Sequence, residues 1–533
     1  MTQDNASRGE ACGAVAPPLL GRPGAAGREG QGAGEGATHG EPSNGVGVLA
    51  GAPAAAMAHF TRFIGLDVHK KMVEACVLDG SGRKVHGEQF ACTPAELGRF
   101  ARQYMGPDVA AALEATTNTW AVCNVLRPYC GHLKVSNPLK TKAIAEANIK
   151  TDKVDANVIG QLLRCDYLPG VWAPDEPTRQ LRQVVARRTA LVQDRTAVKN
   201  RIHSTLAGRM IAVPATRLYD KNGLGWLKTV ELPEQARGFV DSDLRILELL
   251  ESQIALLDEE LAKAAHRHDQ AKLLMTLPGV DFTVAMTLLA ALGDISRFKD
   301  GDHAAAYLGL NPSTKQSANH CHHGPITKHG NSHARWMLVE AAQHLDKHPG
   351  PLGVFFRRLS KKKNRNVAVV ATARKLVTIA LLMLKHNEPY RYAQPATVAA
   401  KLARLRIRAG GKKRKGGNPR GSGRHPNYGT GKNQRRTPGL AEVCQSEGLP
   451  PPLSLDRLPP GEKRMLQETG TLQVIEAFSR PQTRPRSGPS DRQPIESGDS
   501  FATASGAGHP APSPAPEPPP LPLHSLGQGT PCR

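Results

Sequence analysis

The chain has 533 residues, with 70 Lys or Arg against 47 Asp or Glu, so its formal net charge at pH 7 is +23. A charge this positive favours a polyanionic partner, and nucleic acid is the commonest. The nine cysteines include no Cys-x-x-Cys pair, which is typical of reduced thiols and argues against a disulfide framework. The most apolar stretch, Val367 to Leu384, contains Arg374 and Lys375, so we expect a buried helix and no membrane span.

Both ends of the chain are poor in residues that form a core. Residues 1–58 are rich in Gly, Ala and Pro, and we expect a disordered extension. Met57 lies shortly before the first predicted strand, which raises the hypothesis that translation starts there. Residues 393–533 are first basic and then rich in Pro and Ser; from Lys401 to Arg436 there are 13 Lys or Arg and no acid. We expect a disordered tail that binds nucleic acid without reading its sequence.

Between the ends, residues 59–175 predict a mixed sheet with flanking helices. Three consecutive strands are followed by strands that alternate with helices, which is the order of the RNase H fold. The predicted strands are Phe63 to Val68, Val73 to Leu78, Lys84 to Phe90, Val109 to Leu113 and His132 to Val135. The predicted helices are Pro94 to Met105, Asn118 to Tyr129 and Thr151 to Arg164.

Four carboxylates in this region suggest a site for hard divalent cations. Asp67 lies in the middle of an apolar strand, where a buried acid is costly unless it is paired, hydrogen-bonded or bound to a cation. Glu114 follows an apolar run, and Asp152 and Asp155 are three residues apart, so that on a helix they share one face. The alternative for each acid alone is a helix cap or a solvated surface charge. The set as a whole favours a metal site.

Residues 176–270 predict two long helices that form an antiparallel coiled-coil arm, within one chain or between two. Apolar residues recur at spacings of three and four in both helices. They are Leu181, Val184, Leu191, Val198 and Ile202 in the first helix, and Leu247, Leu250, Ile254, Leu257 and Leu261 in the second. The first helix is also rich in cations that could bind a phosphate backbone, with ordinary surface charge as the alternative. The candidates are Arg182, Arg187, Arg188, Arg195, Lys199 and Arg201.

Residues 271–392 predict a small, mainly helical domain. Its segment Leu277-Pro278-Gly279-Val280 resembles the hairpin of a helix-hairpin-helix element, which brings backbone N–H groups to a phosphate, although it could be only a turn. The small and polar residues from Tyr307 to Asn331 predict a loop between helices. His320 to His323 suggest zinc, but adjacent ligands cannot easily face one tetrahedral ion, so we do not expect a metal there.

Taken together, these motifs resemble the DEDD transposases of bacterial insertion sequences, which are related to the Piv invertases. The resemblance rests on Gly65-Leu66-Asp67-Val68-His69-Lys70, Glu114-Ala115-Thr116, Lys150 to Ala156, Leu277 to Val280, and Gly309 to Pro312 through Lys328-His329-Gly330. It implies a RuvC-like DEDD domain and a transposase domain that form one active site on double-stranded DNA. It implies Mg2+ or Mn2+ bound by Asp67, Glu114, Asp152 and Asp155. Some family members are guided by a structured RNA.

The family also implies a serine nucleophile in the second domain, and Ser317 matches it by spacing. This sequence departs from the family pattern after Ser317, where Ala318-Asn319 stand in place of glycines. Ser313, directly after Pro312, is the alternative nucleophile. Lys328 is a further candidate for binding nucleic acid.

The sequence therefore predicts a metal-dependent insertion-sequence transposase or site-specific recombinase, acting in the bacterial cytoplasm at the nucleoid. Two pairs of strands must be exchanged, which favours a homodimer or tetramer, and no membrane partner is expected. Two alternatives stay open. One is a hydrolytic RuvC-like junction nuclease, which needs the four acids but no serine. The other is a non-catalytic nucleic-acid-binding protein.

Overall fold

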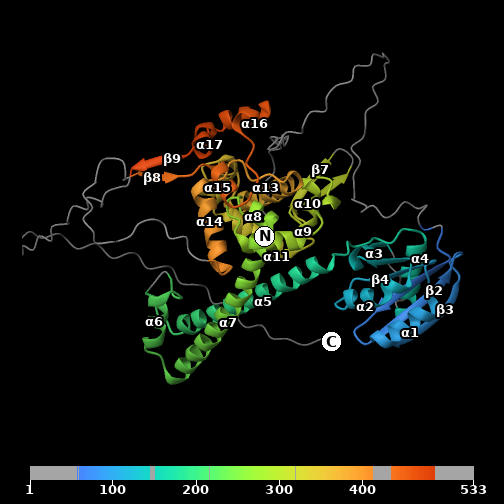
Figure 1. The fold of residues 1–533 in the computed structure, drawn as a ribbon. Coiled ribbons are helices and arrows are strands. Elements are labelled where there is room, and N and C mark those ends of the chain that lie inside the picture. Colours follow the sequence, from blue (N-terminus) through green and yellow to red (C-terminus); the bar gives the residue numbers. More distant parts are fainter. Residues whose placement is uncertain are drawn as a thin grey trace, which may run out of the picture. The chain divides into compact units, whose positions relative to one another are not determined.

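A computed structural model describes residues 57, 59–144, 151–214, 217–317, 320–411 and 434–485. Its sheet of five strands has the order β3-β2-β1-β4-β5 (Figure 1). The strands are β1 (Arg62–Val68), β2 (Met72–Asp79), β3 (Lys84–Ala91), β4 (Val109–Glu114) and β5 (His132–Ser136). Strand β1 is antiparallel to β2 and parallel to β4. The mixed sheet with flanking helices expected from the sequence is confirmed, and its strand order is consistent with an RNase H-like domain.

Alternation of side chains along the strands divides the sheet into two faces. One face packs on helices α1 (Pro94–Tyr104) and α2 (Thr119–Leu126), and the other packs on α4 (Asp152–Arg164). In β1, Ile64, Leu66 and Val68 belong to the first face, whereas Phe63 belongs to the α4 face. Because side chains alternate along a strand, Gly65 and Asp67 also face α4.

Gly65 allows α4 to lie directly on β1. A Cβ atom at this position would be 2.0 Å from the carbonyl oxygen of Ala156 and 2.5 Å from the backbone nitrogen of Gly160. We therefore expect Gly65→Ala to lower the free energy of unfolding by about 3 kcal/mol, at the upper end of overpacking costs. Thermal and urea unfolding would measure the loss. The control is Gly80→Ala, whose Cβ would meet nothing closer than 3.8 Å; equal stability of the two variants would contradict the prediction.

Helix α3 (Pro138–Ile144) was not predicted. It is only seven residues long and its larger apolar side chains, Leu139 and Ile144, are exposed, so no apolar period marks it in the sequence. Asn137 precedes it and accepts hydrogen bonds from the backbone N–H groups of Leu139 and Lys140 through its side chain. Such local capping is what starts the helix.

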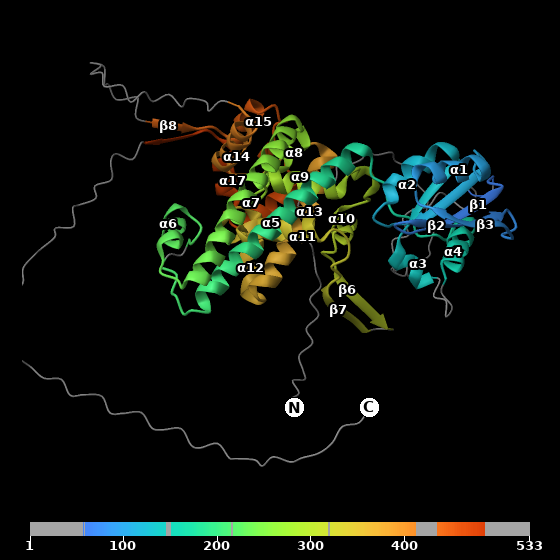
Figure 2. The same cartoon turned by 90° about the horizontal axis from the view of Figure 1, so that it is seen from below.

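Two long helices follow, α5 (Glu176–Ala207) and α7 (Glu234–Arg267), with α6 (Lys221–Thr229) between them. Figures 1 and 2 show α5 and α7 side by side. Their ion pairs, Arg188 with Asp258 and Arg201 with Asp243, run in opposite residue order, so the helices are antiparallel and pair within one chain. Most predicted seam residues are buried, but Val185 and Thr189 are buried where Leu181 and Val184 were expected.

The next helices build the largest hydrophobic core. They are α8 (Asp269–Leu274), α9 (Phe282–Leu292), α10 (Gly301–Tyr307), α11 (Ser332–Gln343), α12 (Pro351–Lys362) and α13 (Arg365–His386). Short 3-10 helices cover Arg127–Tyr129, Ile295–Arg297, Leu345–Lys347 and Leu455–Arg457. Helix α13 is long and apolar enough to cross a membrane, but 61% of its apolar window is buried inside the protein. Leu376, Val377, Ala380 and Leu381 belong to the core, as expected for a buried helix.

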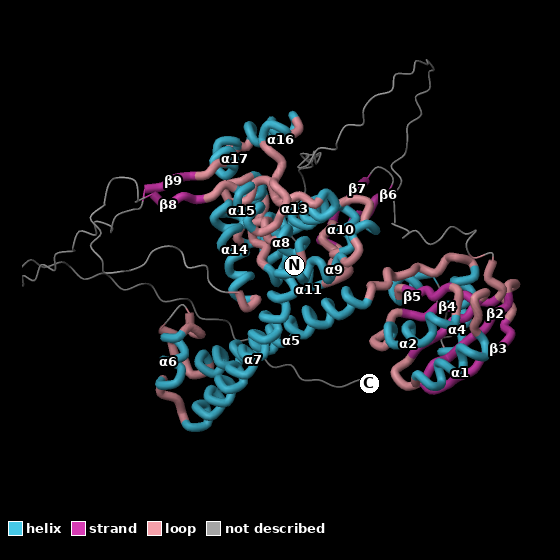
Figure 3. Tube along the Cα trace, in the orientation of Figure 1, coloured by secondary structure: helices cyan, strands magenta, loops and turns pink. Residues whose placement is uncertain are grey.

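The predicted loop from Tyr307 to Asn331 is largely wrong. Strands β6 (Pro312–Ser317) and β7 (His320–Ile326) form an antiparallel hairpin there (Figure 3). Figure 2 shows that the hairpin extends beyond helices α10 and α11, which it joins. Most of its side chains are exposed, so no apolar alternation marks the strands in the sequence.

The expected tail after residue 393 is also wrong for part of its length. Helix α14 (Pro395–Arg408) packs on the core through Val398, Leu402 and Leu405. These residues recur at helical spacing, but the Lys and Arg among them and after them led us to expect a tail. Lys401, counted with the tail, is buried, and its Nζ donates to the carbonyl oxygens of Leu277 (2.6 Å) and Val280 (2.9 Å).

Further helices follow at residues 440–479: α15 (Leu440–Ser446), α16 (Pro460–Glu468) and α17 (Leu472–Ser479). Glu462 of α16 is buried and paired with Arg391 at 2.6 Å, which ties this segment to the core. The short strands β8 (Gln434–Thr437) and β9 (Gln482–Pro485) pair with each other. The remainder of the expected tail, and the expected N-terminal extension apart from Met57, lie outside the described residues.

Candidate active site

Asp67 and Glu114 lie at the same end of two parallel strands. Leu66 of β1 is paired with Leu113 of β4, so the next residue of each strand is an acid. Ala110 and Ala112 pack on the α4 face, so alternation along β4 directs Glu114 toward the same face as Asp67. The strand register therefore brings together two acids that are 47 positions apart in the sequence.

Helix α4 supplies the other two acids from its first turn. Thr151 caps the helix by accepting a hydrogen bond from the N–H of Val154, and Asp152 and Asp155 follow directly. The positive end of the helix dipole stabilises carboxylates in this turn. Because α4 lies closely on β1 at Gly65, its first turn is held near Asp67.

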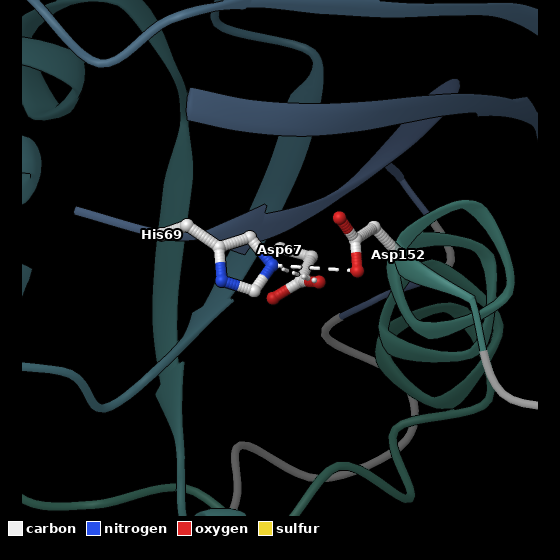
Figure 4. Close-up of side chains that lie close together, drawn as sticks. All are labelled: Asp67, His69 and Asp152. Carbon is white, nitrogen blue, oxygen red and sulfur yellow. Dashed lines mark hydrogen bonds and ion pairs between the residues drawn. The ribbon is translucent and has the colours of Figure 1, made fainter. Parts of the chain in front are cut away.

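Three side chains converge at this point (Figure 4). His69 Nε2 lies 3.1 Å from Asp67 Oδ2 and 3.5 Å from Asp152 Oδ1. Asp67, His69 and Asp152 each offer one ligand atom within 4.8 Å of the others, the one such group found among the described residues. The Asp67 side chain is 15% exposed, whereas those of His69 and Asp152 are about half exposed. The cluster is thus open to a ligand on the α4 side.

The electrostatics of Asp67 favour a bound cation. Burial raises the pKa of the Asp67 carboxyl, the neighbouring His69 opposes this rise, and the charges of Asp152 and Asp155 add to it. A divalent ion would relieve this crowding of negative charge, and carboxylate oxygens are ligands that Mg2+ and Mn2+ favour. The residues present therefore fit the divalent metal that a DEDD centre implies.

The structure brings Asp67 and Asp152 into one cluster with His69, and it directs Glu114 and Asp155 to the same region without including them in that cluster. Sequence reasoning missed His69. Its signal was its position two residues after Asp67, which returns a side chain to the same side of an extended strand.

Ser317 is exposed and is the last residue of β6. Its cross-strand partner in β7 is His320, a pairing that the sequence did not reveal. Ser313 lies near the start of β6, close to Gly324 of β7. A Cβ atom added at Gly324 would be 2.5 Å from the Ser313 Oγ. No hydrogen bond or ion pair among the described residues joins Ser317 or Ser313 to the four acids.

Several of the cations expected to bind nucleic acid are engaged within the protein. Arg188 and Arg201 pair with Asp258 (2.5 Å) and Asp243 (2.6 Å) of α7. Arg182 donates to the carbonyl oxygens of Ala290 (2.7 Å) and Ala291 (3.1 Å), and Lys199 lies 3.8 Å from Glu251.

The other cations have no such partner. Arg187 and Lys328 are exposed and Arg195 is partly exposed, and none of the three makes an ion pair with a described residue. Among the cations that the sequence nominated, these three are left available to phosphate.

The histidine-rich strand β7 does not assemble a metal cluster among the described residues. Alternation along the strand sends His320 and His322 to one side and Cys321 and His323 to the other. Cys321 Sγ and His323 Nε2 are 3.9 Å apart, and His323 Nδ1 lies 3.1 Å from the Thr314 hydroxyl.

Two family models match the chain. Residues 64–211 match the DEDD transposase model of the IS110 type, and residues 271–352 match the transposase model of the IS116/IS110/IS902 family. The first match contains all four acids, and the second contains Ser317.

Curated relatives match over most of their own length. The transposase for insertion sequence element IS1111A of Coxiella burnetii is 26% identical over 351 residues, covering 62% of this chain and 91% of the relative. The pilin gene-inverting protein of Moraxella bovis is 25% identical over 346 residues, covering 62% and 97%. An uncharacterised 43.6 kDa protein of the IS110 element of Streptomyces coelicolor is 24% identical over 397 residues, covering 63% and 97%. The chain therefore belongs to the IS110-type family of DEDD transposases, enzymes that transpose or recombine DNA.

Proposed function

We propose that this enzyme cuts and rejoins DNA strands at the ends of an insertion sequence, with a divalent-metal DEDD centre and Ser317 as the nucleophile. The observation that carries the proposal is the convergence of Asp67, His69 and Asp152 within 4.8 Å, with alternation along β4 directing Glu114 to the same face of the sheet and Asp155 in the first turn of α4. Asp152 at the start of α4 meets Asp67 and His69 at the end of β1 here, although the two segments are far apart in the sequence.

Asp67, Glu114, Asp152 and Asp155 would hold Mg2+ or Mn2+. Bound divalent ions would supply charge stabilisation for the attacking and leaving oxygens of a phosphodiester. Asp67 is central because it is the most buried of the cluster, so its charge is least screened by water. His69 holds Asp67 in place through their 3.1 Å contact.

The Ser317 hydroxyl would lose its proton and attack the phosphorus atom, forming a phosphodiester bond to the serine while the bond from phosphorus to the neighbouring sugar oxygen breaks and that strand leaves with a hydroxyl end. The new bond conserves the energy of the broken one, so a hydroxyl end of a new partner can attack the phosphoserine and rejoin the strand. A serine hydroxyl is a weak nucleophile until a base or a metal ion activates it. The exposure of Ser317 at the end of β6 leaves room for a DNA strand to approach.

The backbone of double-stranded DNA would contact the unpaired cations Arg187, Arg195 and Lys328. Seven further Lys or Arg stand between positions 412 and 433 without an acid, and we propose that they add sequence-independent binding. A deletion that tests this segment has to stay between Gly411 and Gln434, because α14 with its buried Lys401 and the helices of residues 440–479 all belong to the core.

The remaining proposals concern assembly. A homodimer or tetramer would be needed to cut and exchange two pairs of strands. A structured guide RNA from the end of the element would choose the target. The enzyme would act in the bacterial cytosol, where the chromosomal DNA is.

The test is a strand-exchange reaction with the full chain. Labelled donor and target DNA, together with RNA transcribed from the flanks of the gene, are incubated with Mg2+ or with a chelator. We expect joined donor–target product with Mg2+ and none with the chelator. Hydrolysed ends without protein on the DNA would favour the junction nuclease. DNA binding with neither cleavage nor metal uptake would favour the non-catalytic protein.

A further inference from the structure

Glu74 of β2 is a fifth carboxylate beside the proposed metal centre. The register of the antiparallel strands pairs Asp67 with Glu74. Cys76 and Leu78 of the same strand pack on the α4 face, so alternation places Glu74 on that face too. Cross-strand partners on one face have Cβ atoms about 4.5–5.5 Å apart. Asp67 and Glu74 therefore lie opposite each other on neighbouring strands, on the face of the sheet that α4 covers.

The surroundings of Glu74 differ from those of the other deeply buried acids. The described residues include three buried acids: Glu74 (3% exposed), Asp258 (7%) and Glu462 (1%). Asp258 is paired with Arg188 and Arg408, and Glu462 with Arg391. No described residue forms an ion pair or a hydrogen bond with the Glu74 carboxylate, whose oxygen atoms keep some contact with solvent although the residue as a whole is buried.

A buried carboxylate without a cation is costly, and a like charge on the facing strand increases the cost. A divalent ion held by Asp67 would offset both the cost of burying the Glu74 charge and the repulsion between Glu74 and Asp67. Glu74 is not one of the three side chains that converge within 4.8 Å, so a direct ligand role is not what the geometry favours. Mg2+ keeps several of its waters in protein sites, and a carboxylate next to such a site accepts hydrogen bonds from them.

We propose that Glu74 is a positioning residue of the metal centre, binding the waters of the divalent ion that Asp67 holds. The inference rests on the proposed function, since it requires that Asp67 binds a metal. It adds an acid outside the four that the family motif names, supplied by the strand on the other side of β1 from Glu114.

The test measures metal binding and stability, without DNA. Mn2+ is titrated into the full chain by calorimetry, and the melting temperature is recorded with and without Mn2+. Glu74→Gln removes the charge and keeps the volume. We expect its Kd for Mn2+ to rise about 10–100-fold, the usual effect of losing an outer partner of a metal ligand. Its metal-free melting temperature should rise, because the repulsion between positions 67 and 74 is gone, and the gain from Mn2+ should shrink.

A merely structural Glu74 would behave differently, since its loss would lower the metal-free melting temperature and leave the Kd unchanged. Glu74→Asp restores the charge and should recover part of the Mn2+ affinity; it also serves if the glutamine variant fails to fold. The matched control is Glu88→Gln, because Glu88 of β3 lies on the opposite face of the sheet and pairs with Arg99.

Two results would overturn the inference in distinguishable ways. An unchanged Mn2+ Kd in Glu74→Gln, with normal binding by the wild type, rejects the role of Glu74 alone. Absence of Mn2+ binding in the wild type rejects the metal centre itself, and Glu74 with it.

Discussion

Replacing Asp67 by asparagine is expected to abolish DNA strand cleavage while the fold and DNA binding persist. The substitution removes one negative charge from the centre of the acidic cluster and keeps the side-chain volume, so the packing of α4 on β1 is not disturbed. Losing an outer partner of a metal ligand already costs about 10–100-fold. Asp67 is proposed as a ligand, so we expect a loss of more than about 100-fold.

The measurement is the rate of cleavage of labelled DNA at saturating Mg2+, with circular dichroism and DNA binding as checks on folding. Asp194→Asn is the matched control, because Asp194 is an exposed acid on α5 without an ion pair to a described residue. Its rate should stay near that of the wild type. If Asp67→Asn cleaved DNA at the wild-type rate, Asp67 would not be part of the active site.

The second large effect is expected at Ser317. Ser317→Ala removes the hydroxyl that would form the phosphoserine, and no other atom of the side chain can replace it, so the covalent adduct should fall below detection. Because Ser317 is exposed at the end of β6, the alanine should cost little stability. Strand joining should be lost together with the adduct.

The measurement is labelled DNA that stays on the protein after denaturation. Wild type and Ser313→Ala should both carry the label, whereas Ser317→Ala and Asp67→Asn should not. An adduct that survives in Ser317→Ala but disappears in Ser313→Ala would move the nucleophile to Ser313. A wild type that cleaves DNA without any adduct would identify the junction nuclease.

The sequence by itself determined the sheet, most of its helices and the candidate acids. Strands β1, β2 and β4 are nearly continuous apolar runs, which no solvated segment would contain, so a charge such as Asp67 is conspicuous within them. The start of α4 is equally local, because Thr151 caps the helix and Asp152 and Asp155 fall in its first turn. Such features depend only on residues a few positions apart, so they can be predicted from the sequence alone.

Features that join distant segments were decided by the tertiary structure. The strand register made Glu74 the partner of Asp67 and His320 the partner of Ser317. A shift of one residue would reverse the face of every side chain, and no local pattern excludes it.

Packing also overruled composition. From the sequence we expected Lys401 to belong to a basic tail. In the folded chain it is buried, and it donates hydrogen bonds to the carbonyl oxygens of Leu277 and Val280 inside the core. A polar hairpin likewise formed where an exposed loop was expected, since backbone pairing needs no apolar side chains. The physical reason is common to these cases: burial and pairing partners are properties of the folded chain, and a local stretch of sequence does not contain them.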